Sequence, residues 1–149
     1  MTLVMKIGGA SGPLYGSLFM AMGKAMAETP GGPGDVAAAL AEGVAAVKKR
    51  GKSDAGEKTM LEVLIPVAEA LCAGAQAGEA PAALLDRVRA AARHGLESTR
   101  DMKATKGRAS YLGERSIGHI DPGARSSELL VACVCDFAAT MPNAGAQEA

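Results

Sequence analysis

Aromatic residues are scarce in this chain of 149 residues, which has two Phe, two Tyr and no Trp. A core without large rings must be built from Leu, Val, Met and Ala, and this composition favours close-packed helices. An excess of charge of one sign is also missing, because 16 basic and 16 acidic residues leave a net charge of zero. The sequence therefore lacks the electrostatic footprint that nucleic acid or an anionic membrane surface requires.

Long apolar runs and a disulfide framework are absent as well. No apolar run reaches the length of a membrane span, and the N-terminus lacks the plan of a signal peptide. The three cysteines, Cys72, Cys133 and Cys135, suit a reducing compartment, so we expect a cytoplasmic protein. Residues two apart on a helix point to different sides, so Cys133 and Cys135 are expected in the core rather than on a metal.

Five helical segments are predicted from turn residues at segment ends and from apolar residues at helical spacing. By composition, residues 127–139 could also be a buried strand, but their length and serine start favour a helix. Residues 4–7 are too short to found a sheet, so the expected class is all-α in a single domain. The predicted helices are residues 14–27, a segment that Asp35 caps and Gly51 ends, residues 58–73 with a kink at Pro66, a segment that starts at Pro81, and residues 127–139.

Chemistry is expected at the joints between these helices, and the first joint is "IGGASGPLYG". It places Gly8, Gly9, Ser11 and Gly12 directly before a helix. Free backbone N–H groups and the helix dipole at such a point can cradle a phosphate. For this pattern alone the better interpretation is that the glycines only permit a tight turn. No complete Walker motif and no dinucleotide-binding glycine motif occurs.

Two further joints carry charge. "RGKSDAGEKTM", residues 50–60, brings lysines and a threonine to a helix start, although for this stretch alone a solvated loop is the better interpretation. Residues 106–127 hold three arginines and four glycines. Within them Arg108 offers a fork for phosphate, Asp121 can accept from a ribose hydroxyl or the backbone, and His119 is more typical of a structural histidine than of a catalyst. Three such joints are expected to gather at one end of a helix bundle around a phosphorylated ligand.

Three motifs carry a family resemblance: "GGASGPLYG" (residues 8–16), "GEKTMLEVLIP" (56–66) and "KGRASYLGERSIGHIDPGA" (106–124). Together they resemble the nucleotide-binding L subunit of dihydroxyacetone (glycerone) kinase, which is also the C-terminal domain of single-chain ATP-dependent enzymes. The resemblance covers nearly the whole chain and implies an antiparallel helix barrel with a nucleotide at one end. It implies transfer of a phosphoryl group to dihydroxyacetone held on a histidine of a separate K subunit. In bacterial three-subunit systems a phosphotransferase-system protein recharges the bound ADP.

The resemblance also implies a binding site for ADP or ATP, whose residues are assigned by matching positions of this chain to the family's motifs. The family reads Gly-Asp-Lys-Thr-Met where this chain has Glu57 as the second residue, a longer acid of small expected effect. The implied nucleotide-binding residues are Ala10 and Ser11 on the phosphate side, Gly51 and Met60 around the adenine, Arg108, and Asp121, Pro122 and Gly123 in a loop that closes over the nucleotide.

One departure from the family concerns magnesium. The family's domain has further helices ahead of the glycine loop, with a Gly-Asp-x-Asp-His type segment whose aspartates hold two magnesium ions. This chain has six aspartates and no Asp-x-Asp pair, so residues 1–149 resemble an incomplete L domain whose metal ligands are expected upstream of Met1. An upstream start of the natural protein is favoured over a second chain that supplies the helices.

Two functions follow from this departure. The favoured one is a kinase subunit that needs the metal segment and a K partner, and the alternative is an inactive remnant with a regulatory or scaffold role. The chain alone is expected to be inactive, to expose an apolar groove where the further helices would pack, and to be a possible homo-oligomer. A phosphotransferase-system protein is the other expected partner, with no nucleic acid and no membrane.

Overall fold

A computed structural model describes residues 9–27 and 31–141, and within them it contains α-helices, two short 3₁₀ helices and no strand. The expected all-α class is confirmed. Residues 4–7, the segment too short to found a sheet, lie outside the described residues. The elements are α2 (Ser11–Met26), α3 (Pro33–Gly51), α4 (Leu61–Gln76), α5 (Pro81–Ser98), η1 (Thr99–Asp101), η2 (Arg108–Ser116) and α6 (Pro122–Thr140).

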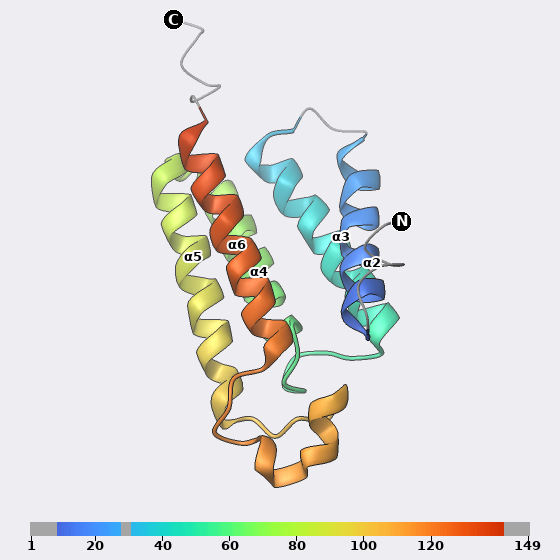
Figure 1. Cartoon of the computed structure of the whole chain (residues 1–149). Coiled ribbons are helices and arrows are strands. Elements are labelled where there is room, and N and C mark those ends of the chain that lie inside the picture. Colours follow the sequence, from blue (N-terminus) through green and yellow to red (C-terminus); the bar gives the residue numbers. More distant parts are fainter. Residues whose placement is uncertain (1–8, 28–30, 142–149) are drawn as a thin grey trace, which may run out of the picture.

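The helices run up and down in sequence, so that neighbours along the chain are antiparallel (Figure 1). α2 packs on α3, α3 on α4, and α4 on both α5 and α6, which also pack on each other. As a result α2, α4 and α6 begin, and α3 and α5 finish, at the same end of the bundle, the lower end in Figure 1. We call this the joint end, because it carries the glycine-bearing connections.

Helix α4 is shared by two apolar cores. Leu61 and Leu64 pack with residues of α2 and α3, while Val63 and Val67 pack with residues of α5 and α6. A helix that contributes to two cores must be apolar on more than one face. Pro66 lies inside α4, where the helix continues through it to Gln76.

Four helix starts differ from those expected, and the first is that of α2, which begins at Ser11 rather than Leu14. Asp35 does not cap α3 directly but is its third residue, and its carboxylate accepts from the N–H groups of Gly31 and Gly32, at 3.1 Å each. This reciprocal arrangement still satisfies the helix start, since an acid at that position can reach back to the capping residue. The third helix begins at Leu61 rather than Lys58.

The last helix begins five residues earlier than expected. Asp121 caps α6, because its carboxylate accepts from the N–H of Ala124 at 2.7 Å. Pro122 then occupies the first helical turn, where a missing N–H costs nothing and the fixed φ suits the helix. The expectation that Pro122 and Gly123 form a turn or a closing loop was therefore wrong, since both residues are in the helix.

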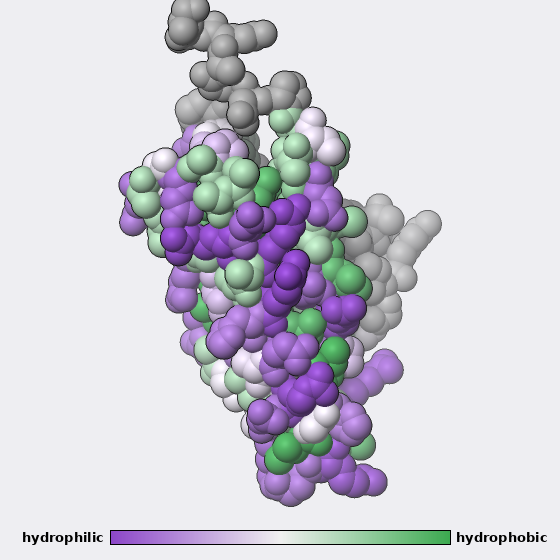
Figure 2. Space-filling model, turned by 90° about the vertical axis from the view of Figure 1, so that its left-hand side faces the viewer, coloured by the Kyte–Doolittle hydropathy of each residue, from purple (hydrophilic) through white to green (hydrophobic). Residues whose placement is uncertain are grey.

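Helix α5 starts at Pro81 as expected and divides into an apolar and a charged face. Val88, Ala92 and Leu96 are buried. Figure 2 looks onto the side of the molecule where α5 lies, and strongly hydrophilic side chains cross this face. Part of the charged face is paired, because Arg87 of α5 forms an ion pair with Glu79. Among the described residues, no helix combines the length and the apolar character needed to cross a membrane.

An apolar surface is exposed between α2 and α6, which we call the α2–α6 face. A pocket there is lined by Tyr15, Phe19, Ser126 and Leu130. Other large apolar side chains of these helices are exposed as well, and in Figure 1 the two helices are further apart away from the joint end. The most exposed in the two helices are Phe137 at 66%, Met20 at 60%, Val134 at 59% and Leu129 at 54%, and Met141, directly after α6, is 56% exposed. The apolar groove expected from the sequence is present; what covers it stays a prediction.

We expect this face to make the chain self-associate. Burying a large apolar side chain contributes about 1.5–3 kcal/mol, so Phe137→Lys should weaken association by about tenfold or more. Sedimentation equilibrium over a range of concentrations measures the effect. The matched control is Ala90→Lys, which adds the same charge to an exposed position of α5. A monomeric wild-type chain that resists heating would contradict the prediction.

Candidate functional site

At the joint end the first joint, residues 9–12, lies against the third joint, and the turns of α2 that follow it lie against the second. A Cβ built on Gly9 would lie 3.7 Å from Nη2 of Arg108, and one built on Gly51 would lie 3.3 Å from Cδ2 of Leu14 in the first turns of α2. Tyr15 adds a polar link, since its hydroxyl lies 2.9 Å from that of Ser127 in α6. The start of α2 is therefore fixed against the end of α3, the 106–124 segment and α6.

The second and third joints, residues 51–60 and 106–124, are also in contact. Lys106 donates to the carbonyl of Lys52 at 2.7 Å, and its ammonium lies 3.4 Å from the carboxylate of Glu57. A Cβ on Gly123 would lie 3.4 Å from the backbone N of Met60. All three joints predicted from the sequence thus converge at one end of the bundle, as expected.

The helix starts at this end differ in what they offer to a ligand. At α2 the capping residue, Ala10, supplies no side-chain hydrogen bond to the first turn. The N–H groups of that turn have no partner within the helix and can therefore donate to an anion, which the helix dipole favours. At α6 the carboxylate of Asp121 already occupies the equivalent place. An anion would therefore bind at α2 rather than at α6.

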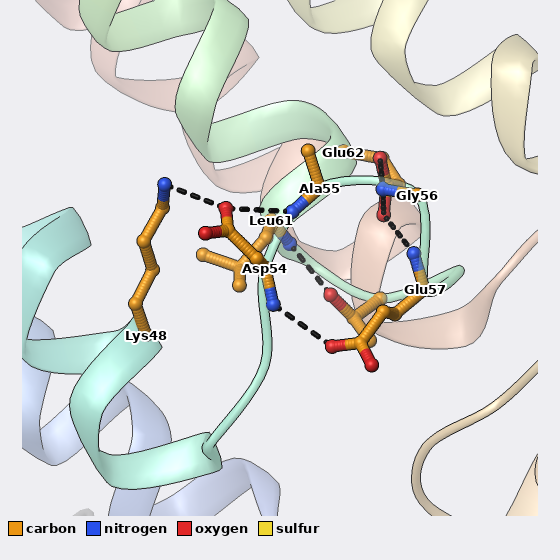
Figure 3. A network of polar contacts seen from close by, with 8 residues as sticks. Lys48, Asp54, Ala55, Gly56, Glu57, Leu61 and Glu62 are labelled. Atoms are coloured by element: carbon orange, nitrogen blue, oxygen red, sulfur yellow. Dashed lines mark hydrogen bonds and ion pairs between the residues drawn. The ribbon is translucent and has the colours of Figure 1, made fainter.

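Acidic side chains shape the second joint from within (Figure 3). The carboxylate of Glu62, in the first turn of α4, accepts from the N–H groups of Gly56 and Glu57 at 3.1 and 3.2 Å. Asp54 pairs with Lys48 at 2.6 Å, and its hydrogen bond from Lys48 holds the pKa of that exposed carboxyl below its usual range. The joint is a folded loop with its own internal bonds, and the interpretation of it as merely solvated was incomplete.

Every buried polar or charged side chain among the described residues lies near this end of the bundle. Five of the six bond a joint or a helix terminus and the sixth, Ser127, bonds the hydroxyl of Tyr15, which meets the general requirement that buried polar groups be paired. For example, Thr99 accepts from the N–H of Asp121 at 2.9 Å and donates to the carbonyl of Leu96 at 2.7 Å. These residues are Lys58, Glu62, Thr99, Ser116, Asp121 and Ser127.

Asp121 fills one of the two roles expected of it. Its Oδ2 accepts from the N–H of Ala124, which is the expected acceptance from the backbone, and acceptance from a ribose hydroxyl stays a prediction. Only 8% of the residue is exposed, and burial raises the pKa of its carboxyl, while the N–H groups of Ala124 and Gly123 and the charge of Lys58 lower it.

The other expected site residues differ in exposure. Ala10, Arg108 and Pro122 are exposed, while Ser11, Gly51 and Gly123 are partly buried. Met60 is 4% exposed and packs in the core of α2, α3 and α4, so its side chain supports the site from beneath. His119 is exposed, and Glu114 pairs with Lys103 at 2.6 Å.

Several supporting residues were missed by the sequence analysis. Glu62 stands alone as an acid in the apolar run "TMLEVLIP", and this isolation was a usable signal of a buried, bonded carboxylate. Tyr15, Thr99, Ser116 and Ser127 gave no comparable signal, since single hydroxyl residues are common on helix surfaces.

No metal centre is formed by the described residues. They contain no group of three or more His, Cys, Asp or Glu side chains placed to hold an ion. The two acids deepest in the joint end, Glu62 and Asp121, already bind backbone N–H groups. These residues therefore do not fit a magnesium site.

Comparison with protein families decides the identity of this fold. The model of the DAK2 domain matches residues 1–136. The chain belongs to the DAK2 domain family. This DAK2 domain is 53% identical over 131 residues to the ADP-binding subunit of PEP-dependent dihydroxyacetone kinase 1 from Listeria innocua, a match that covers 87% of the chain and 60% of the relative.

Two further relatives carry similar names. The ADP-binding subunit of the PTS-dependent dihydroxyacetone kinase of Lactococcus lactis is 46% identical, over 87% of this DAK2 domain and 60% of the relative. The ADP-binding subunit of the PEP-dependent enzyme of Escherichia coli is 42% identical, over 85% of the domain and 60% of the relative. This DAK2 domain thus spans about three fifths of the length of the relatives it matches.

Proposed function

We propose that this chain forms the nucleotide-binding end of a dihydroxyacetone kinase subunit. In this role it holds ADP or ATP at the joint end and passes the phosphoryl group to dihydroxyacetone on a partner K subunit. The observation that carries the proposal is the convergence of three separate glycine-bearing joints around the uncapped start of α2. Membership of the DAK2 family and the ADP-binding relatives support it.

The chain's own residues divide the binding work. The N–H groups in the first turn of α2, at Ser11 and Gly12, donate to phosphate oxygens. Arg108 adds a charged fork from the third joint, near Gly9. Gly51 lies on the adenine side, where Leu14 packs against it and Met60 fills the core below.

Magnesium and the partners complete the proposed function. Because the described residues do not fit a magnesium site, we propose that the acids that hold this ion lie outside them. A bound magnesium ion would neutralise phosphate charge during transfer. The PEP- and PTS-dependent relatives support a phosphotransferase-system protein as donor, and a cytoplasmic location is proposed with it.

Substitution of Arg108 tests the site. We expect Arg108→Ala to weaken ADP binding by about 10- to 100-fold, because it removes hydrogen bonds to a charged group worth about 1.5–3 kcal/mol. Calorimetric titration of ADP, with and without magnesium, measures the change. His119→Ala is the matched control, since His119 is exposed in the same segment and should leave affinity unchanged.

A coupled kinase assay extends the test to activity. The chain is extended by the segment of a relative that it does not match, then mixed with an active K subunit, dihydroxyacetone and a phosphoryl donor. We expect transfer that falls with Arg108→Ala and persists with His119→Ala. An equal loss of ADP affinity in both variants would indicate that the substitutions disturb folding rather than a contact with the nucleotide. Tight ADP binding without any transfer would instead favour a regulatory or scaffold role.

A further inference from the structure

Lys58 is a buried cation at the joint end. Only 2% of the residue is exposed, a rare condition for lysine, whose charge normally stays in water. Its backbone is left-handed, with φ of 57°, a conformation that non-glycine residues seldom adopt. The chain therefore tolerates both an unfavourable backbone and a buried charge at this position, and such outliers cluster at functional sites.

The ammonium of Lys58 bonds the backbone of a distant segment. It donates to the carbonyl of Met102 at 3.0 Å and to the carbonyl of Ser116. These two carbonyls lie at the two ends of residues 102–116, which we call the arginine loop because it contains Arg108. One side chain from the second joint, shortly before α4, thus ties together both ends of the loop.

The surroundings of Lys58 show what its charge does. Among the described residues, no carboxylate lies within ion-pair distance of its ammonium. The charge of Lys58 is nevertheless felt by Asp121 at the start of α6. Because its hydrogen-bond partners among the described residues are both backbone carbonyls, the ammonium acts mainly as a donor to the loop.

A second tie holds the arginine loop from inside. The hydroxyl of Ser116 accepts from the N–H of Ala104 at 2.9 Å and donates to the carbonyl of Gly113 at 2.7 Å. Just beyond the loop, the N–H of Gly118 donates to the carbonyl of Arg100 at 2.8 Å. Lys58 therefore joins a closed loop to α4, and Arg108 projects from that loop toward Gly9.

We propose that Lys58 is a positioning residue, whose buried ammonium closes the arginine loop and sets Arg108 against the start of α2. The inference rests on the proposed function, because it gives Lys58 its purpose through Arg108. Lys58 itself does not touch the ligand. Its removal takes this donor from the part-buried carbonyl of Met102 and the buried carbonyl of Ser116, which loosens the loop rather than the helical core.

The test compares Lys58→Met with Arg108→Ala and with the double variant in the full chain. We expect Lys58→Met to lower affinity for ADP about tenfold. The double variant should bind no more weakly than Arg108→Ala alone, since residues that act through one another are not additive. Lys103→Met is the matched control, because Lys103 is an exposed lysine of the same loop that pairs only with Glu114. Its affinity should match the wild type.

Hydrogen exchange provides a readout that does not depend on ADP. In Lys58→Met the amides of Ala104 and Gly118 should exchange about tenfold faster or more, while those of Leu64 and Val67 in α4 keep their protection. Where Lys58→Met fails to fold, Lys58→Gln replaces it, because its amide nitrogen lies one atom closer to the backbone than the ammonium and cannot hold both carbonyls in the same way, so the same two amides should still exchange faster. Unchanged exchange at Ala104 and Gly118, or additive affinity losses, would overturn the positioning role. A wild-type chain that does not bind ADP would contradict the proposed function. The exchange result would still decide whether Lys58 holds the arginine loop.

Discussion

We expect the chain to bind ADP more tightly in the presence of magnesium when it is extended by the part of the Listeria innocua relative that it does not match. The affinity should rise about 100-fold over that of the unextended chain, which is a gain in binding free energy of about 2.7 kcal/mol. The joint end provides N–H donors and Arg108, but the described residues form no cluster of acids to hold a cation. Nucleotide phosphates carry several negative charges that a bound magnesium ion offsets. Calorimetric titration of both proteins measures the gain.

The source of this gain can be isolated. In a second extended protein, the aspartates of the added segment are changed to asparagine, which keeps the added helical surface and removes the charge. We expect this protein to lose most of the gain with magnesium and little of the binding without it. Equally tight binding by the unextended chain would contradict the proposal that the metal-holding acids lie outside the described residues.

Replacement of Gly95 by alanine is expected to lower the free energy of unfolding by about 3 kcal/mol. This is a large part of the total, because the free energy of unfolding of a domain is typically about 5–15 kcal/mol. A Cβ on Gly95 would lie 2.1 Å from the carbonyl oxygen of Glu62 and 3.0 Å from Cα of Val63. Both neighbours are backbone, so α4 and α5 would have to move apart. Urea unfolding followed by circular dichroism measures the loss.

The consequence of Gly95→Ala should reach the second joint as well. Glu62, whose carbonyl would be displaced, also holds Gly56 and Glu57 through its carboxylate. The matched control is Gly23→Ala in α2, where a new Cβ meets nothing within 4 Å. This change should stabilise the chain by about 0.5–1 kcal/mol, because alanine is the better helix former. A neutral effect of Gly95→Ala would show that the two helices are not held at this distance.

The helices could be predicted from sequence because their signals are local. Apolar spacing and a proline at the first position identified α5 down to its first residue, Pro81. The start of α6 was misjudged because Asp121, Pro122 and Gly123 suit a turn as well as a cap followed by a first helical turn. Only the side-chain bond from Asp121 to the N–H of Ala124 separates the two, and this bond has no signature beyond the residue types.

The place of the candidate site was predictable, but its construction was not. Three glycine-bearing joints in an up-and-down bundle had to fall at helix ends, and the structure brings them to one end. The burial of Lys58 and its bond to the carbonyl of Met102, 44 residues away, depend on tertiary packing. Lysine at a loop is ordinarily a solvated residue, so its sequence context pointed to the surface.

The central claim is that nucleotide binds at the joint end, and mapping of amide chemical shifts tests it most directly. ADP is titrated into the ¹⁵N-labelled chain, since the location of a ligand is visible even where its affinity is low. We expect the largest changes at residues 10–12, 51–60 and 107–124, with residues 76–81 at the opposite end of the bundle unaffected. Changes centred on residues 76–81 or on the outer face of α5, or no change at all, would contradict the account.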